Sequence, residues 1–282
     1  MPSRTLPYLL LAPAVLFLAA FFLYPAVQVA IIAFTRGDEY TFANFARMAS
    51  HWKFDTALWN TILLAAVVVP LQLALALFMG QIVTQMGRGR DLVLYVFTIP
   101  LGISDLAAGI IWLAILEQNG FLNSFLYHLG LLESPVARLG YGNMLALFAA
   151  VAIAEIWRAT AIMLVILVAG MGLIPKEYNE AAEVFGAGPW TRFVKVTLPL
   201  LKPSLQTALI LRTILAFEVF AVVAALAGTS MPMLMGETYA WEFQLQDRGV
   251  AASYALVILG ISIASTLVFL WWLRTPKGAR IA

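Results

Sequence analysis

The segment AASYALVILGISIASTLVFLWWL, residues 251–273, carries no charged side chain over its whole length. As a helix rising about 1.5 Å per residue, a segment this long crosses the ~30 Å hydrocarbon core of a bilayer. Five other apolar runs resemble it, at about 8–33, 60–84, 92–116, 144–169 and 205–227. Lipid cannot hydrogen-bond a bare backbone, so spanning segments of this kind form helices. The chain is therefore predicted to be an all-α polytopic membrane protein with six transmembrane helices in the lipid bilayer.

The composition of the whole chain supports this class. Its 282 residues are 62% hydrophobic and 11% charged, whereas soluble domains carry about 25% charge. We find no tandem repeat and no low-complexity segment, so residues 1–282 are predicted to form a single transmembrane domain. The first apolar run is longer than the ~7–15-residue core of a signal peptide, and we expect it to be a retained span.

The absence of cysteine and the scarcity of histidine limit the chemistry of the chain. Without cysteine there is no disulfide scaffold or thiolate metal site. His51 and His128 both fall in predicted outer loops, where we expect them to be solvated. No metal site and no nucleic-acid partner are expected. A membrane-embedded enzyme would need a cluster of metal ligands or a nucleophile, which these residues do not supply.

The distribution of positive charge sets the expected orientation. Placing both termini in the cytoplasm leaves ten cations inside: Arg4, Arg88, Arg90, Lys176, Arg192, Lys195, Lys202, Arg274, Lys277 and Arg280. The outer loops then hold five: Arg36, Arg47, Lys53, Arg138 and Arg248. This excess follows the positive-inside rule.

Residues 175–200 form a polar, glycine-broken loop between two apolar runs. Pro175 suits the first turn of a helix, Gly186 can end that helix, and Pro189 cannot continue it. A second short helix fits residues 190–197. The residues alone are compatible with a hairpin lying at the membrane surface or with a handle presented to a partner in the cytoplasm.

The spacing of this loop resembles a known signature. Glu180-Ala181-Ala182, then Gly186, then Val196-Thr197-Leu198-Pro199 is similar to the "EAA" motif of ABC importer permeases, with Val196 where isoleucine is usual. The opening of the chain, Trp157-Arg158 and the Gly249–Ser253 segment also resemble the MalF-type sugar permeases of that family. The resemblance assigns coupling to an ATPase to seven residues: Glu180, Ala181, Ala182, Gly186, Val196, Leu198 and Pro199.

The resemblance also implies an assembly. A second, MalG-like permease, two ATPase subunits and an extracytoplasmic solute-binding protein would accompany the chain in a prokaryotic inner membrane. The chain lacks a phosphate-binding G-x-x-x-x-G-K-[ST] loop. We therefore expect it to be non-catalytic and to bind no cofactor, with ATP and Mg held by the ATPase. One departure is the turn after the fifth span: Ala227-Gly228-Thr229-Ser230-Met231-Pro232 replaces the family's Thr-Gly-Gly-Pro.

Charged residues inside the predicted spans are the candidates for the solute pathway, because a charge in mid-bilayer costs roughly 2.5–3.5 kcal/mol. Glu155 and Arg158 are three residues apart and can pair. By resemblance to maltose-type permeases, solute contacts fall at Glu155, Ala159, Ile162, Arg212, Leu215 and Ala216. Asp105 and Glu218 are further candidates, and Gln72 is a weaker one. For Glu155–Arg158 a structural ion pair is an equal alternative, and Arg212 is also compatible with snorkelling to the surface.

The expected function is therefore a permease subunit that moves a sugar, such as a disaccharide or oligosaccharide, into the cytoplasm by alternating access. Permeases for glycerol phosphate or another polar solute would look similar. An ion-coupled secondary transporter is a third alternative, to which Asp105, Glu155 and Glu218 could contribute a relay of acidic residues.

Overall fold

A computed structural model describes residues 6–134, 136, 139 and 143–274. Some of the predictions fall outside these described residues, namely the sides of the membrane predicted for Arg4, Arg138, Lys277, Arg280 and both chain ends. Most of the described chain is helical, as predicted. Its helices follow the order α1 Leu6–Leu18, η1 Ala19–Leu23, α2 Tyr24–Ala33, α3 Ala43–Ala49, α4 Phe54–Gln85, α5 Arg90–Thr98, η2 Ile99–Gly102, α6 Asp105–Leu116, α7 Phe121–His128, α8 Met144–Gly172, α9 Lys176–Val184, α10 Pro189–Arg192, η3 Phe193–Thr197, α11 Leu198–Leu200, α12 Lys202–Phe217, α13 Ala221–Leu226, α14 Leu234–Tyr239, η4 Ala240–Gln244 and α15 Arg248–Trp272. Strands β1 Thr35–Arg36 and β2 Glu39–Tyr40 form a small antiparallel hairpin in which Thr35 pairs with Tyr40.

Within this part of the chain, four helices are long and apolar enough to cross a membrane: Tyr8–Ala33, Phe54–Gln85, Met144–Gly172 and Arg248–Trp272. They match four of the six predicted spans. Two further spans arise if each of two bent helix pairs, Arg90–Gly102 with Asp105–His128 and Pro189–Leu200 with Lys202–Phe217, is counted as one.

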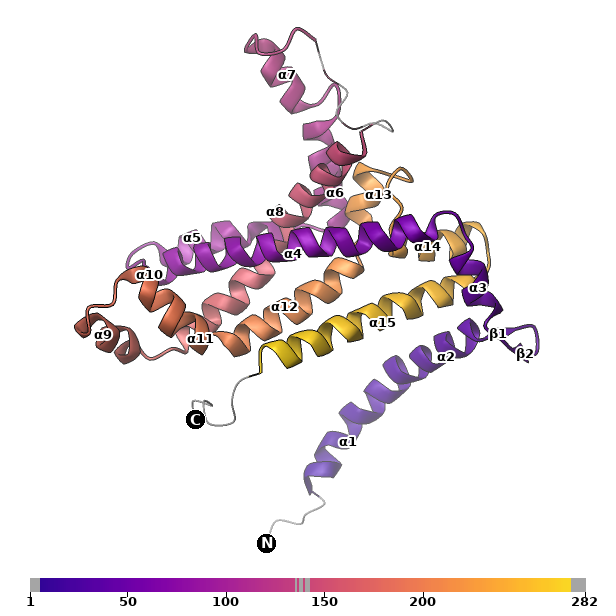
Figure 1. Cartoon of the computed structure of the whole chain (residues 1–282), viewed down its shortest axis with the longest axis horizontal. Helices are drawn as coiled ribbons and strands as arrows, with labels where there is room; N and C mark the ends of the chain where they lie inside the picture. Colours follow the sequence, from indigo (N-terminus) through magenta and orange to yellow (C-terminus); the bar gives the residue numbers. More distant parts are fainter. Residues whose placement is uncertain (1–5, 135, 137–138, 140–142, 275–282) are drawn as a thin grey trace.

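The third predicted span, 92–116, is not the straight helix that its composition suggests. Its two halves meet at 96°. Pro100 lies in the 3-10 turn η2, and Ser104 begins a new helix by accepting a hydrogen bond from the backbone N–H of Ala107, 3.2 Å away. As a result, α6 and α7 stand away from the direction of α4 in Figure 1.

The fifth predicted span, 205–227, is also interrupted. Helix α12 ends at Phe217, and α13 packs on α6 instead of continuing the direction of α12. Gly109 permits this crossing, because a Cβ there would lie 2.6 Å from the Cβ of Ala225. The break thus follows from contact between two distant segments.

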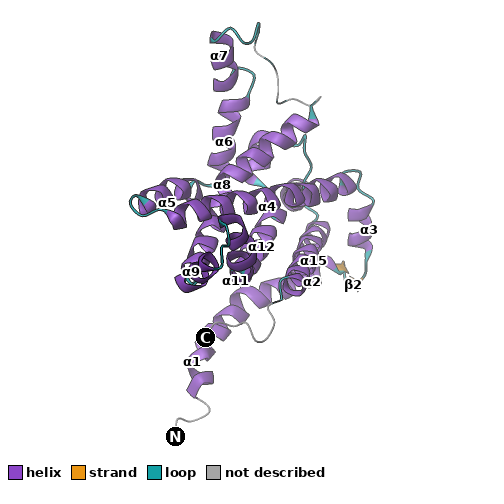
Figure 2. Ribbon diagram, turned by 60° about the vertical axis from the view of Figure 1, so that its left-hand side comes forward, coloured by secondary structure: helices purple, strands orange, loops and turns teal. Residues whose placement is uncertain are grey.

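Helices α4, α8, α12 and α15 form the centre of the bundle (Figure 1), and they supply most of the buried apolar residues of the larger of two core clusters. The second cluster joins α4 and α8 to α13. Helix α2 runs beside α15, whereas α1 stands clear of the other helices in both views (Figures 1 and 2). In the most apolar 18-residue stretch of the span Tyr8–Ala33, no residue is buried. This span therefore depends on lipid or on a partner chain for its apolar contacts.

Candidate functional site

The loop between α8 and α12 folds as the helix–turn–helix bracket that the sequence predicts. Helix α9 ends where Gly186 takes a positive φ of 75°, which favours glycine. The N–H of Ala187 then donates to the carbonyl of Ala182 at 2.9 Å. Arg192 in α10 donates to the carboxylate of Glu183 in α9 at 2.8 Å, which ties the two arms of the bracket together.

The tip of the bracket exposes large apolar side chains. Val184, Phe185 and Trp190 are 86%, 90% and 75% exposed. Figure 1 shows α9 and α10 at the end of the bundle, away from α13 and α14. Phe185 therefore has almost no contact within its own chain, although fully burying a side chain of this size is worth about 1.5–3 kcal/mol.

The seven predicted coupling residues are distributed from this tip to the bundle. Glu180, Ala181, Gly186 and Pro199 are exposed, whereas Ala182, Val196 and Leu198 are half-buried. Leu198 packs against the larger core cluster. The motif thus begins on a surface open to a partner and ends in contact with the transmembrane core.

A second group of candidate residues forms a buried polar network in the middle of the bundle. Arg212 of α12 donates from Nη2 to Oε2 of Glu155 in α8 at 2.7 Å, and from Nε to Oε1 of Gln72 in α4 at 2.6 Å. Gln72 donates in turn to the backbone carbonyl of Glu155 at 2.8 Å. Glu155 and Arg212 are 0% and 1% exposed, so Arg212 does not snorkel to the surface.

The network continues towards α6. Arg158 lies 3.7 Å from Glu155 and 2.8 Å from Asp105, the first residue of α6. The side chain of Asp105 is 46% exposed and that of Arg158 is 13% exposed. Two carboxylates therefore balance two guanidinium groups, which meets the requirement that buried charges be paired. The expected Glu155–Arg158 pair is present, but the shorter contact joins Glu155 to Arg212.

The remaining pathway candidates divide by exposure. Ala159 and Ala216 are buried with the network, whereas Ile162 is half-buried and Leu215 and Glu218 are exposed. The structure thus brings Glu155, Arg212 and Asp105 together through Arg158. It leaves Glu218 without an ion pair within the described residues.

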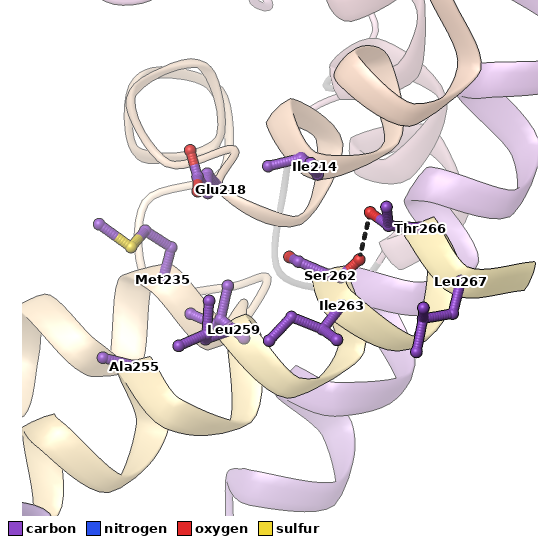
Figure 3. Close-up of a pocket in the computed structure, with 10 residues that line it drawn as sticks. Ile214, Glu218, Met235, Ala255, Leu259, Ser262, Ile263, Thr266 and Leu267 are labelled. Carbon is purple, nitrogen blue, oxygen red and sulfur yellow. Dashed lines mark hydrogen bonds between the residues drawn. The ribbon is translucent and has the colours of Figure 1, made fainter. Parts of the chain in front are cut away.

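Glu218 lines a pocket of about 380 Å³ between α12, α14 and α15. Figure 3 shows its carboxylate beside a mostly aliphatic lining that includes Ile214, Leu259 and Ile263. The hydroxyl of Thr266 in this lining donates to the backbone carbonyl of Ser262 at 2.8 Å. Glu218 is thus the only carboxylate among the residues that line this pocket.

Two groups had little signal in the sequence. Gln72 is an uncharged amide in the middle of an apolar run, yet it is fully buried and joins three helices. Glu237 is 6% exposed and faces Lys53 at 3.6 Å and His51 at 3.9 Å, so His51 is not the freely solvated residue that we expected. Within the described chain, no three His, Asp or Glu side chains gather as metal ligands would.

Comparison with known proteins shows matches over most of the chain. Residues 72–275 match the family described as "Binding-protein-dependent transport system inner membrane component". A sulfoquinovosyl glycerol transport system permease protein of Agrobacterium fabrum is 31% identical, over 97% of this chain and 92% of the relative. A trehalose/maltose transport system permease protein of Thermococcus litoralis is 30% identical, over 94% and 92%. A chain from the crystal structure of a bacterial alginate ABC transporter, in complex with a periplasmic protein that holds an alginate pentasaccharide, has the same fold, with a TM-score of 0.79 at 20% identity over 95% of this chain and 94% of that one.

Proposed function

Since this chain belongs to the family of binding-protein-dependent transport system inner membrane components, we propose that it is the permease subunit of an ABC importer that carries a sugar into the cytoplasm. The relatives named above transport sugars or a sugar glycoside, which supports a carbohydrate as cargo. The cargo would cross by alternating access of the helix bundle.

The observation that carries this proposal is the exposed apolar tip of the bracket. A side chain such as Phe185, 90% exposed and set among the charged residues of α9, has the character of an interface anchor. Its partner would be a cytoplasmic ATPase that holds ATP and Mg, while this chain hydrolyses nothing. Movement of that ATPase would reach the spans through Leu198, which lies at the end of the bracket and packs against the core.

The complete importer would contain a second permease, two ATPase subunits and an extracytoplasmic solute-binding protein. Both termini would lie in the cytoplasm, since that orientation places the bracket on the side of the ATPase and agrees with the distribution of cations. The apolar surface left uncovered on α1 offers contact area for lipid or for the second permease.

The burial of the polar network separates two roles among the pathway candidates. Glu155 and Arg212 bond to one another at 2.7 Å and have almost no exposed surface, although Oε1 of Glu155 and Nη1 of Arg212 are buried without a hydrogen-bond partner. We assign them to holding α4, α8 and α12 together. Asp105 and Glu218, which keep exposed carboxylate surface, are the better candidates for contact with sugar hydroxyls.

Replacing Phe185 with alanine tests the role of the bracket. Phe185 makes few contacts in its own chain, so the stability of the variant should be unchanged. Loss of an aromatic anchor should weaken association with the ATPase by about 2 kcal/mol or more. The measurement is the amount of ATPase that co-purifies with the tagged permease.

The matched control is Phe121→Ala, which removes a 68%-exposed phenylalanine from α7, away from the bracket. It should leave the ATPase bound. Equal recovery of the ATPase with both variants and with the unmodified chain would exclude the tip as the docking surface.

A further inference from the structure

A cleft of about 780 Å³ lies behind the bracket, on the side facing the spans. One wall is the last turns of α4, where Gln81, Thr84 and Gln85 supply polar groups. The other lining residues come from the end of α8, the start of α9 and the second arm of the bracket, which supplies Pro189, Arg192, Phe193 and Thr197. The volume of the cleft falls within the ~300–1,000 Å³ range of small-ligand sites.

The charges lining this cleft leave an excess of positive charge. Arg90, Lys176 and Arg192 face a single carboxylate, that of Glu177. Arg192 is already paired with Glu183 outside the cleft. Arg90 and Lys176 form no ion pair with any described residue, and Nε of Arg90 is buried without a hydrogen-bond partner. A ligand with one negative charge and several acceptor oxygens would satisfy these donors.

The position of the cleft places it at the edge of the bilayer. Helix α4 has 32 residues, or about 48 Å at the usual rise, so its ends extend beyond a ~30 Å hydrocarbon core. Beyond Arg90, helix α5 exposes the apolar residues Leu92, Tyr95 and Val96. Acyl chains would contact this face of α5 while a polar headgroup occupied the cleft.

We propose that this cleft binds the phosphodiester headgroup of an anionic phospholipid of the inner leaflet, with Arg90 and Lys176 as its cationic contacts. Basic pockets between helices on the cytoplasmic side of a membrane are suited to such headgroups. A lipid held here would contact α4, α5 and α9 together. The proposal rests on the proposed function only for the orientation of the chain.

The test uses the purified full chain in mixed micelles that contain phosphatidylglycerol or phosphatidylcholine, with bound lipid counted by native mass spectrometry. The unmodified chain should retain phosphatidylglycerol in preference to phosphatidylcholine. The double variant Arg90→Gln, Lys176→Gln should lower the affinity for phosphatidylglycerol by about 30-fold, at about 1 kcal/mol for each cation.

The control is Arg88→Gln, Lys195→Gln, which removes the same charge from the same two loops at exposed positions that do not line the cleft. It should retain the lipid. Equal loss of lipid from both double variants would show attraction to a diffuse surface charge and would overturn the proposal.

Two further results would also overturn it. Displacement of phosphatidylglycerol by millimolar inorganic phosphate would assign the cleft to a free anion. Loss of ATPase co-purification with unchanged lipid retention in the Arg90, Lys176 variant would assign it to an acidic segment of the ATPase. Lipid retention needs neither cargo nor ATP. A chain that fails to retain the lipid would therefore overturn the lipid site without bearing on the transport function.

Discussion

Replacing Arg212 with methionine should destabilise the bundle far more than replacing any exposed arginine. Methionine fills a similar volume but donates no hydrogen bond, so Oε1 of Gln72 and Oε2 of Glu155 each lose a donor that is now 2.6–2.7 Å away. An unsatisfied buried polar atom costs about 1–3 kcal/mol. Two such atoms account for the roughly 3–5 kcal/mol expected when a buried ion pair loses one partner.

The compensating variant separates lost pairing from lost packing. Glu155→Gln together with Arg212→Met removes one charge of each sign and leaves Arg158 paired with Asp105. The double variant should be more stable than the sum of the two single effects predicts, by about 2 kcal/mol. The control is Arg192→Met, whose partner Glu183 is 67% exposed, so that the pair is worth about 0–1 kcal/mol.

The assay is reversible unfolding of the purified chain by sodium dodecyl sulfate in mixed micelles, followed by tryptophan fluorescence. If Arg212→Met costs no more than Arg192→Met, or if the two single effects simply add, the network is not the clamp that the geometry indicates.

Three other changes probe the same structure. Gly109→Ala should destabilise the α6–α13 crossing by about 1–3 kcal/mol, and adding Ala225→Gly should restore part of the loss in the same unfolding assay, because it removes the 2.6 Å contact. Asp105→Asn leaves Arg158 with only the 3.7 Å contact to Glu155. Because the side chain of Asp105 is half-exposed, the loss of stability should be about 1 kcal/mol. Sugar uptake should also fall if Asp105 faces the pathway. Gly186→Ala imposes a side chain at a φ of 75° and should cost α9 about 1 kcal/mol, measured as faster proteolysis of the bracket with the spans intact.

The sequence predicted the fold class and the bracket well because both depend on local signals. Uninterrupted apolar runs require helices in lipid, and Pro175, Gly186 and Pro189 mark the ends of the bracket helices wherever the chain folds. Pro100 and Gly102 also signal a break in the third span, although its apolar composition favoured a continuous helix.

The remaining features depend on contacts between distant segments. Residues 218–220 contain neither glycine nor proline, so nothing local indicates that α12 ends there and that α13 turns to meet α6. Gln72 and Arg212 are 140 residues apart, and a glutamine in the middle of an apolar run does not identify its partner. Resemblance to known permeases placed Glu155 and Arg212 near the solute pathway, and only the folded chain shows that they bond to one another.

In the proposed importer, the bracket between α8 and α12 receives force from a separate ATPase. This coupling is tested by sugar uptake into proteoliposomes that contain the complex isolated from its native membrane with mild detergent, with and without ATP at the ATPase face. We predict that an ATPase subunit accompanies the chain in fixed stoichiometry and that uptake requires ATP. A chain that purifies alone and still carries the sugar without ATP would refute this coupling.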